Sequence, residues 1–393
     1  MENVVGEADA TGLLDDIMKD AHLRRATDVH FEPEKLGYRI RLRVDGHMQE
    51  FKRPLGEAEG DAVVTRIKVL ANLDIAEQRL PQDGGMTYQI QQWEVPPNDI
   101  RIATVPTRWG ERVTLRLLGQ GTGGFNLSQL GMPEFILAPF QAALDRPHGI
   151  ILVTGPTGSG KSTTLYAALR ELDTDELNVL TVEDPIEQVI EGISQVQVST
   201  KVGFAQALRS FLRHDPDVIL VGEIRDLDTA ETALKAAMTG HLVLSTLHTN
   251  DAVSAITRLA DIGVPPYLIG STLIGVMAQR LVRRLCPHCR EPVPPEMDTP
   301  PVRGAPDLGV APYRPKGCPL CLGTGYLGRV GLYESLWIDP ALGEMVAAGA
   351  REDELRRAAG ERYHTLLQDG REKIGAGLTS RAEVQHLIIA AGG

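Results

Sequence analysis

The sequence predicts an α/β fold in which a phosphate-loop nucleotide-binding domain follows a smaller α+β domain. Three observations lead to this prediction. Four short, almost wholly apolar segments alternate with helical stretches, as the strands of a parallel sheet covered on both faces do. A glycine-rich loop joins the first of these segments to a helix. Before them, apolar and polar residues alternate, as in antiparallel strands. The four apolar segments are residues 150–154, 179–182, 218–221 and 242–246.

The chain has 393 residues, which is enough for two or three domains. Its net charge of -12 argues against a general nucleic-acid coat, whose affinity would come from many contacts of lysine and arginine with phosphates. No apolar run approaches the roughly 20 residues that cross a bilayer, and the acidic start lacks the features of a signal peptide. We therefore expect a cytoplasmic protein that reaches any membrane through a partner.

Residues 1–118 are expected to form the α+β domain. Thr11 is predicted to cap a first helix, and the segment VHFEP has the pattern of a strand. Residues 38–51 are predicted to form a hairpin with Asp45-Gly46 as its turn. One face of its first strand would be apolar and the other would carry guanidinium groups, a pattern that also fits a plain solvated sheet face. The arginines are Arg39, Arg41 and Arg43.

Two further strands, at residues 100–105 and 113–118, complete this domain. Residues 119–127 are expected to be a linker, because four of the six residues from 119 to 124 are glycine. The alternation of strands and helices then assigns residues 128–285 to the nucleotide-binding domain.

The strongest motif is a phosphate loop that follows the apolar strand GIILVT and precedes a helix. Its glycines let backbone N–H groups surround phosphates, and the following helix adds its positive N-terminal end. Lys161 is expected to reach the β- and γ-phosphates of ATP, and Ser162 to hold Mg²⁺. The expected nucleotide-binding residues are Gly155, Pro156, Thr157, Gly158, Ser159, Gly160, Lys161, Ser162 and Thr163.

Polar side chains follow three of the other strand candidates: Glu183, Glu223 and His248. Because ligands of parallel sheets sit beyond the carboxyl ends of the strands, we expect these side chains to converge near the γ-phosphate. A carboxylate there can orient or deprotonate water, and an imidazole can sense the phosphate. Each residue alone could merely end its strand. A phosphate loop is also found in small-molecule kinases, nucleic-acid motors and nucleotide-gated scaffolds that do not hydrolyse ATP.

The four cysteines form two Cys-x-x-Cys pairs, Cys286/Cys289 and Cys318/Cys321. Four thiolates in two such pairs fit a closed tetrahedral Zn²⁺ site, which predicts a structural role for residues 286–321. A nucleic-acid-binding zinc ribbon and a redox dithiol are the alternatives. His288 is expected to be exposed, because the cysteines already supply four ligands. Residues 322–393 are expected to form a helical C-terminal subdomain.

The order of these motifs resembles the secretion ATPase superfamily, in its type II secretion and type IV pilus assembly branch. LTVEDPIE resembles the family's Asp box, and VILVGEIRD through STLHTNDA resembles its Walker B segment and His box. The resemblance extends from TDVHFEP through RLRVDG and AQRLVRRLCPHC to GRVGLYE. It implies a RecA-like motor domain behind a PAS-like domain, six subunits in a ring, and ATP bound between the two domains.

The resemblance also implies residue roles. Glu183 would activate water, Glu223 would be the Walker B glutamate, and His241 and His248 would be the His-box histidines. Arginines of the first domain would approach the nucleotide, and arginine suits this role because its planar fork pairs with phosphate oxygens. Arg41 and Arg43 match this part best, and Arg101 and Arg116 match it less closely.

The function that the resemblance implies is an ATPase that powers type II secretion, including pseudopilus assembly and export across the outer membrane. Pilus assembly and competence ATPases are the alternatives within the family. The expected partners are further copies of this chain and the inner-membrane platform and cytoplasmic-domain proteins of the machine, with no nucleic acid. Pilus retraction ATPases lack the cysteine element, which favours extrusion. Many type II secretion ATPases carry an extra N-terminal docking domain, and this sequence is either a natural short form or a trimmed one.

Overall fold

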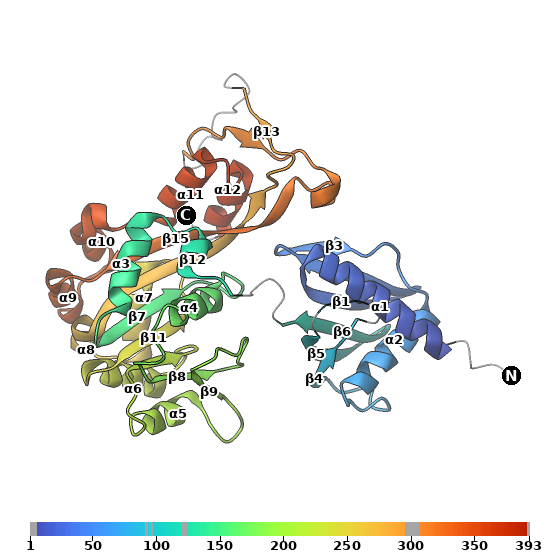
Figure 1. Ribbon diagram of the computed structural model, residues 1–393, viewed down its shortest axis with the longest axis horizontal. Helices are drawn as coiled ribbons and strands as arrows, with labels where there is room; N and C mark the ends of the chain where they lie inside the picture. The colour runs from blue at the N-terminus through green and yellow to red at the C-terminus, as the bar shows by residue number, and fades with distance from the viewer. Residues whose placement is uncertain are drawn as a thin grey trace. The chain divides into compact units, whose positions relative to one another are not determined.

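The computed structural model describes residues 6–90, 93, 95, 97–118, 124–294 and 307–390. The chain divides into two compact units, residues 1–123 and 124–393, which Figure 1 shows in blue to teal and in green to red. Residues 119–123 of the predicted linker lie outside the described residues.

The first unit contains a six-stranded antiparallel sheet with the strand order β3-β2-β1-β6-β5-β4. Two helices pack on one face, and their apolar residues form a single core with the inward-facing residues of the strands. The elements are α1 (Gly6–Arg24), β1 (Ala26–Glu34), β2 (Gly37–Val44), β3 (His47–Glu50), α2 (Glu57–Leu70), β4 (Gln82–Tyr88), β5 (Asn98–Thr107) and β6 (Gly110–Leu117).

The predicted hairpin is confirmed. β2 pairs with β3, and the turn residues Asp45 and Gly46 both have positive φ, as a tight hairpin turn requires. The apolar residues of β2 are buried, whereas its arginines lie on the other face. The predicted helix cap at Thr11 is wrong, because α1 begins five residues earlier, at Gly6. Helix α2 and strand β4 were not predicted.

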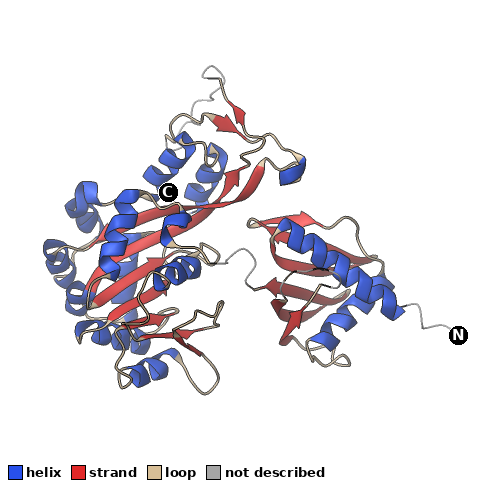
Figure 2. Cartoon of the chain, viewed as in Figure 1, coloured by secondary structure: helices blue, strands red, loops and turns tan. Residues whose placement is uncertain are grey.

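The second unit is built on a seven-stranded sheet with the order β15-β12-β7-β11-β10-β8-β9, in which only β15 runs antiparallel to its neighbour (Figure 2). All four predicted parallel strands are present. The strands are β7 (Gly149–Thr154), β8 (Val179–Glu183), β9 (Ser194–Gln197), β10 (Val218–Val221), β11 (Leu242–Leu247), β12 (Leu273–Leu285) and β15 (Tyr326–Trp337).

Both faces of this sheet are covered by helices. Alternate residues of β7, such as Ile150 and Ile151, belong to different apolar cores on the two faces. Helices α5 to α10 pack on one face, and α3 and α4 pack with the 3-10 helix η1 on the other. The elements are η1 (Leu127–Leu130), α3 (Glu134–Leu144), α4 (Lys161–Leu169), α5 (Phe204–Phe211), α6 (Leu227–Met238), α7 (Ala252–Ile262), α8 (Pro266–Thr272), α9 (Pro340–Ala347) and α10 (Glu352–Ala359).

The C-terminal part contains the predicted helices but begins with β15, because Leu332 and Leu336 of this segment pair with β12 in the sheet. A small apolar core joins the ends of β12 and β15 to α11 and α12. The remaining elements are β13 (Glu291–Pro292), β14 (Tyr313–Arg314), η3 (Pro319–Cys321), η4 (Gly360–Arg362), α11 (Leu366–Gly375) and α12 (Arg381–Ala390). Across the described parts of the chain, no helix has the length and apolar character needed to cross a membrane.

Candidate functional site

The phosphate loop connects β7 to the N-terminus of α4, as the sequence predicted. Gly155 and Gly160 have φ values of +148° and +89°, which residues with a side chain rarely adopt. A Cβ atom on Gly155 would lie 2.5 Å from the backbone oxygen of Gln279 on the neighbouring strand β12. Position 155 therefore has no room for a side chain, whereas Pro156 to Gly158 at the tip of the loop are exposed.

Lys161 lies in this loop with its ammonium group turned back on the loop itself. Its Nζ donates to the backbone oxygens of Gly155, at 2.8 Å, and Pro156, at 3.1 Å. Burial, followed by the charge of Arg280, lowers the pKa of Lys161 to about 8, against the opposing effect of Glu223. These two carbonyl oxygens accept the Lys161 hydrogen bonds that phosphate oxygens accept in phosphate-loop proteins.

Glu223 and His248 lie with Lys161 at the carboxyl edge of the sheet, beyond the ends of β10 and β11. The Glu223 carboxylate pairs with Arg225 at 2.5 Å and with His248 Nε2 at 3.3 Å. Burial, followed by the charge of Lys161, lowers the pKa of His248 and favours its neutral form near pH 7. The structure thus brings a lysine, a carboxylate and an imidazole together at this edge, as the strand order predicts.

Glu183 ends β8 at the same edge but has a separate set of partners. Its side chain is only 5% exposed. The hydroxyl of Tyr166 donates to Oε2, while Thr181 Oγ1, at 2.5 Å, and Gln195 Nε2, at 3.1 Å, donate to Oε1. Both carboxylate oxygens are therefore hydrogen-bonded. Gly222, next to Glu223, donates its N–H to Val182, so the two glutamates stand on adjacent strand ends.

Ser162 and Thr163 lie in the first turn of α4, where the helix N-terminus favours negative charge. Both are partly exposed. The Oγ of Ser159 is buried and has no hydrogen-bond partner in the described part of the chain. The hydroxyl and N–H groups of this turn are suited to phosphate and Mg²⁺ oxygen chemistry.

His241 lies away from this cluster. It directly precedes β11, whereas His248 follows it, so the six-residue strand separates them by roughly 20 Å. Its Nδ1 is 2.9 Å from the backbone oxygen of Ala236. Within one chain, His241 is therefore at the edge of the sheet opposite the phosphate loop, because strand β11 runs through the domain between the two histidines.

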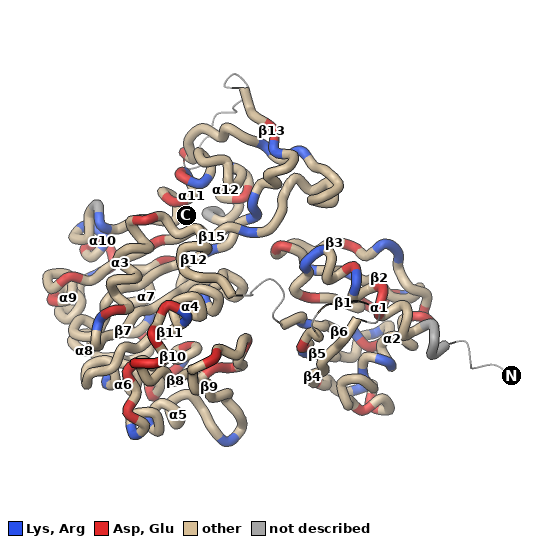
Figure 3. The backbone as a smooth tube through the Cα atoms, in the orientation of Figure 1, with Lys and Arg blue, Asp and Glu red and all other residues tan. Residues whose placement is uncertain are grey.

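The four predicted arginines lie on the outward face of the first unit's sheet. Four residues are paired in one row across the neighbouring strands β2, β1, β6 and β5: Arg43, Asp28, Arg116 and Arg101. The Asp28 carboxylate lies 3.1 Å from Arg116 Nε and 3.9 Å from Arg43 Nε. The charged residues on these strands are marked in Figure 3. A carboxylate between arginines holds them in place on this face.

Arg41 is the most firmly held of the four. Its guanidinium donates to both carboxylate oxygens of Glu32, at 2.7 and 2.6 Å, and Arg112 contacts the same carboxylate at 2.6 Å. Burial raises the pKa of Glu32, but the hydrogen bond from Arg41 and the charge of Arg112 outweigh it, so the pKa is lowered. Arg41 is thus held in a fixed orientation by Glu32, whose carboxylate accepts from both its Nε and its Nη2.

Sequence reasoning did not identify several residues that support this site. Gln279 and Arg280 follow the apolar part of β12, whose Ala278 pairs with Thr154 just before the phosphate loop. Gln279 accepts a hydrogen bond from Thr164 of α4 at 2.7 Å, and Arg280 is 6% exposed beside the lysine. The apolar run LIGVMA before Gln279 was the signal that could have revealed a strand next to β7.

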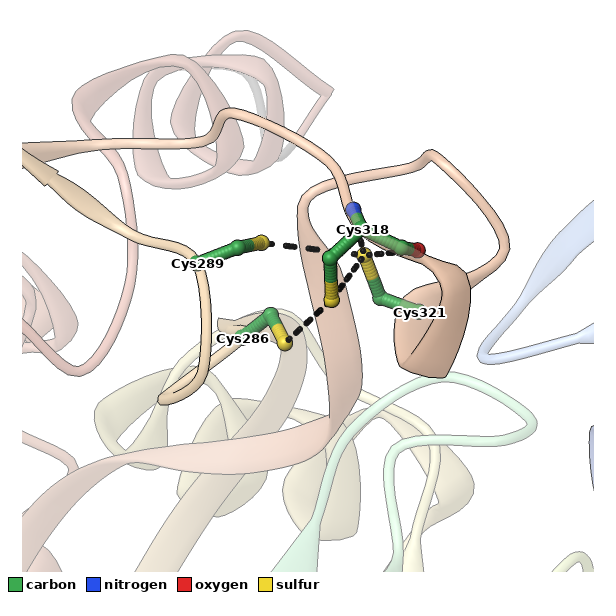
Figure 4. A group of neighbouring side chains, drawn as sticks. All are labelled: Cys286, Cys289, Cys318 and Cys321. Atoms are coloured by element: carbon green, nitrogen blue, oxygen red, sulfur yellow. Dashed lines mark hydrogen bonds between the residues drawn. The ribbon is translucent and has the colours of Figure 1, made fainter.

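The four cysteines converge from two segments, as Figure 4 shows. Three Sγ–Sγ distances are 3.9 Å for Cys286–Cys318, 3.8 Å for Cys289–Cys321 and 3.7 Å for Cys318–Cys321. Sulfur atoms bound at about 2.3 Å to a tetrahedral zinc ion lie about 3.8 Å apart, so the spacing fits Zn²⁺. His288 is exposed, as predicted.

Backbone donors favour the thiolate form of Cys321. The N–H groups of Cys318 and Gly325 both point to Cys321 Sγ, at 3.2 Å. Burial alone would raise the pKa of Cys321, but these donors lower it to about 6. The donor set is therefore compatible with zinc, which binds thiolates.

A second group of potential ligands, His364, Asp369 and Glu372, also has atoms within 4.8 Å of one another. In this group the positive charge that a metal ion would bring comes from Lys373, whose Nζ lies 2.6 Å from Asp369 Oδ2. The buried ion pair with Lys373 gives this group a structural explanation that needs no metal ion.

Comparison with known proteins agrees with the motif order. A family model described as type II/IV secretion system protein matches residues 4–386. Type II secretion system protein E of Klebsiella pneumoniae is 49% identical over 378 residues, which cover 95% of this chain and 74% of that protein. Type II secretion system ATPase E of Vibrio cholerae is 47% identical over 380 residues, with the same coverage of 95% and 74%.

Two solved structures share the fold over nearly the whole chain. The pilus retraction motor PilT with bound ADP has a TM-score of 0.65 and 27% identity, and the match covers 95% of this chain and 96% of that one. The Legionella pneumophila ATPase DotB has a TM-score of 0.70 and 22% identity, with coverage of 97% and 96%. Together with the family model and the close relatives, these matches confirm the resemblance: the chain belongs to the type II/IV secretion system protein family.

Proposed function

We propose that this chain is an ATP hydrolase that powers type II protein secretion. The observation that carries the proposal is the gathering of Lys161, Glu223 and His248 at the carboxyl ends of neighbouring parallel strands, next to a phosphate loop. The relative from Vibrio cholerae, 47% identical, is named a type II secretion system ATPase, which supports ATP as the substrate and secretion as the process.

Each group in this cluster has a specific proposed role. The phosphate loop, residues 155–163, binds the triphosphate, and Lys161 exchanges its carbonyl partners for the β- and γ-phosphates. Ser162 and Glu223 would hold Mg²⁺, which would neutralise charge on the phosphates. Glu183 orients and deprotonates the attacking water, and His248 contacts the γ-phosphate as a neutral donor.

The arginines Arg41, Arg43, Arg101 and Arg116 are proposed to contact phosphate oxygens of a bound nucleotide, from the same or a neighbouring subunit. His241 is proposed to contact the nucleotide of a neighbouring subunit and not that of its own. We propose a homohexameric ring as the working assembly. The proposed partners are the inner-membrane platform and cytoplasmic-domain proteins of the secretion machine. The chain would be cytoplasmic, and these partners would hold it at the inner membrane.

The cysteine cluster is proposed to hold one structural zinc ion. Cys286, Cys289, Cys318 and Cys321 would supply four thiolates, so that the ion has no open position for substrate. We also propose five parts of the chain: a PAS-like domain (1–118), a linker (119–127), a RecA-like ATPase domain (128–285), the zinc-binding subdomain (286–321) and a helical C-terminal subdomain (322–393).

Phosphate release from Mg²⁺-ATP by the purified full chain tests this function. We expect slow but measurable hydrolysis that Lys161→Ala abolishes. The same assay with added single-stranded or duplex DNA and with RNA tests a nucleic-acid motor, which would show strong stimulation. Binding of ATP without any hydrolysis, even with membrane partners present, would instead identify a nucleotide-gated scaffold and overturn the proposal.

A further inference from the structure

We propose that Tyr166 is a positioning residue for Glu183: its hydroxyl sets the orientation of the Glu183 carboxylate through a hydrogen bond to Oε2. This inference rests on the proposed ATP hydrolysis at the same site. Tyr166 lies on α4, the helix that starts at Lys161, so one helix would present a lysine to the phosphates and a hydroxyl to the base. The two side chains are 2% and 5% exposed, which excludes bulk water from their contact.

The direction of the hydrogen bond is fixed by the surroundings of the hydroxyl. The Tyr166 oxygen accepts a hydrogen bond from the backbone N–H of Glu187 at 3.0 Å. Its own proton is therefore available for Glu183 Oε2, to which it donates. Burial, together with the hydrogen bond and the charge of Glu183, raises the pKa of Tyr166. The phenol consequently stays protonated and acts as a donor at every pH at which the enzyme would work.

The carboxylate partners are not equivalent. Thr181 and Gln195, which both donate to Oε1, stand on the neighbouring strands β8 and β9 and face each other in register. Tyr166 alone reaches Oε2 among the donors that the structure describes. Hydrogen bonds to the charged form of a carboxyl lower its pKa and fix its rotamer. Tyr166 is therefore the group that decides where the second oxygen of Glu183 points.

Tyr166 also ties α4 to the segment that follows β8. Its hydroxyl holds the Glu187 N–H, and Arg170, one turn further along, donates to Gln188 Oε1 at 2.5 Å. Glu187 in turn contributes to the electrostatic field at Lys161. Nucleotide contacts at the start of α4 and the orientation of Glu183 are thus connected through side chains of a single helix.

The test is the pH dependence of ATP hydrolysis by Tyr166→Phe, which keeps the ring and removes the hydroxyl. We expect kcat to fall about tenfold to a hundredfold, the effect of losing one hydrogen bond to a charged group, while KM for ATP changes less than about threefold. A hydrogen bond to the charged form of a carboxyl favours that form, so removing the donor favours the protonated form. The acid limb of the kcat profile should therefore move to higher pH, a change that simple loss of structure does not produce.

A ring-fluorinated tyrosine at position 166 should shift the acid limb of the kcat profile in the opposite direction. Fluorine makes the phenol a stronger donor, so the acid limb should move to lower pH in a protein of nearly unchanged shape. This variant carries the test if Tyr166→Phe does not fold. Tyr267→Phe is the matched control, because Tyr267 is exposed and distant in sequence from the site, and its kcat and pH profile should equal those of the wild type.

The outcomes separate this inference from the proposed function. Hydrolysis by the wild type that Lys161→Ala abolishes supports the function independently of Tyr166. Given that result, a Tyr166→Phe protein with wild-type kcat and an unmoved acid limb overturns the positioning role alone. A variant that only loses thermal stability, with the same acid limb, overturns it as well. Absence of hydrolysis in the wild type contradicts the function itself.

Discussion

The phosphate loop and the cysteine cluster are both built from short sequence motifs, yet their side chains are satisfied in different ways. The cysteine sulfur atoms lie 3.7 to 3.9 Å apart in three pairs, which is the spacing of a tetrahedral metal site. In the phosphate loop, Lys161 donates to carbonyl oxygens of its own loop, and Glu223 pairs with Arg225 and His248. The polar side chains of the proposed nucleotide site are thus satisfied by other groups of the protein.

The difference indicates how each site relates to stability and function. A closed four-cysteine site leaves no position for a substrate, so a metal ion bound there would contribute to folding. The phosphate loop offers exposed backbone at its tip, and in the proposed function its residues contribute to binding and turnover. Substitutions at the two sites should therefore change different measurements.

The largest expected effect is on stability at the cysteine cluster. Replacing Cys318 and Cys321 together by Ser should remove the bound zinc and lower the free energy of unfolding by about 4 kcal/mol or more, the size expected for loss of a structural metal. Metal content and chemical denaturation measure this. His288→Ala is the matched control, because the exposed His288 lies within the same motif and should leave the zinc in place. Equal zinc content in the double variant would contradict a four-cysteine site.

A smaller stability effect, accompanied by a binding defect, is expected at the phosphate loop. In Gly155→Ala the new Cβ would lie 2.5 Å from a backbone oxygen of Gln279, at a φ of +148°. We expect destabilisation of about 1–3 kcal/mol and at least tenfold weaker nucleotide binding, measured by fluorescent-nucleotide titration. Gly203→Ala is the control, since a Cβ atom there meets nothing within 4 Å. Unchanged affinity in Gly155→Ala would show that this backbone does not approach the nucleotide.

The smallest effect is a pH dependence of nucleotide binding. The pKa of Lys161 is lowered to about 8 in the free loop, mainly by burial, and phosphate contacts should raise it in the complex. Above pH 8 the free lysine is increasingly neutral and must take up a proton to bind. Affinity for a non-hydrolysable ATP analogue should therefore fall several-fold between pH 7.5 and pH 9.

Calorimetry in buffers of different ionisation enthalpy measures the proton uptake directly. Lys161→Arg is the control, because arginine stays charged over this range and the pH dependence should disappear. A wild-type affinity that is constant up to pH 9 would contradict the proposed exchange of partners by Lys161.

The sequence was most informative where a segment is apolar on both faces. Strands β7, β8, β10 and β11 were predicted because every one of their residues is buried. β15 was missed because it contains a buried charge: Glu334 is 4% exposed and accepts hydrogen bonds from Tyr363 and Ala252. In a sequence, a glutamate indicates a surface position, because the partners that allow its burial are distant along the chain.

The same limit applies to α2 and to the site. Gly60 lies inside α2 because the Tyr38 ring would be 2.0 Å from a Cβ atom, a contact that no local pattern reveals. Lys161 was predicted from the phosphate-loop motif, and Glu223 and His248 from their places after apolar strand segments. The partners of Glu183 could not be predicted, because Tyr166 comes from a helix and Gln195 from a short polar edge strand that has no apolar signal.

The central claim is that the carboxyl edge of the parallel sheet is an open nucleotide site in which Glu183 serves the chemistry of ATP hydrolysis. Glu183→Gln tests it most directly, because the amide keeps the size of the side chain but cannot act as a base. We expect ATP affinity close to that of the wild type and a fall in kcat of about a hundredfold to ten-thousandfold, with no change in zinc content. Wild-type phosphate release from Glu183→Gln would contradict the claim.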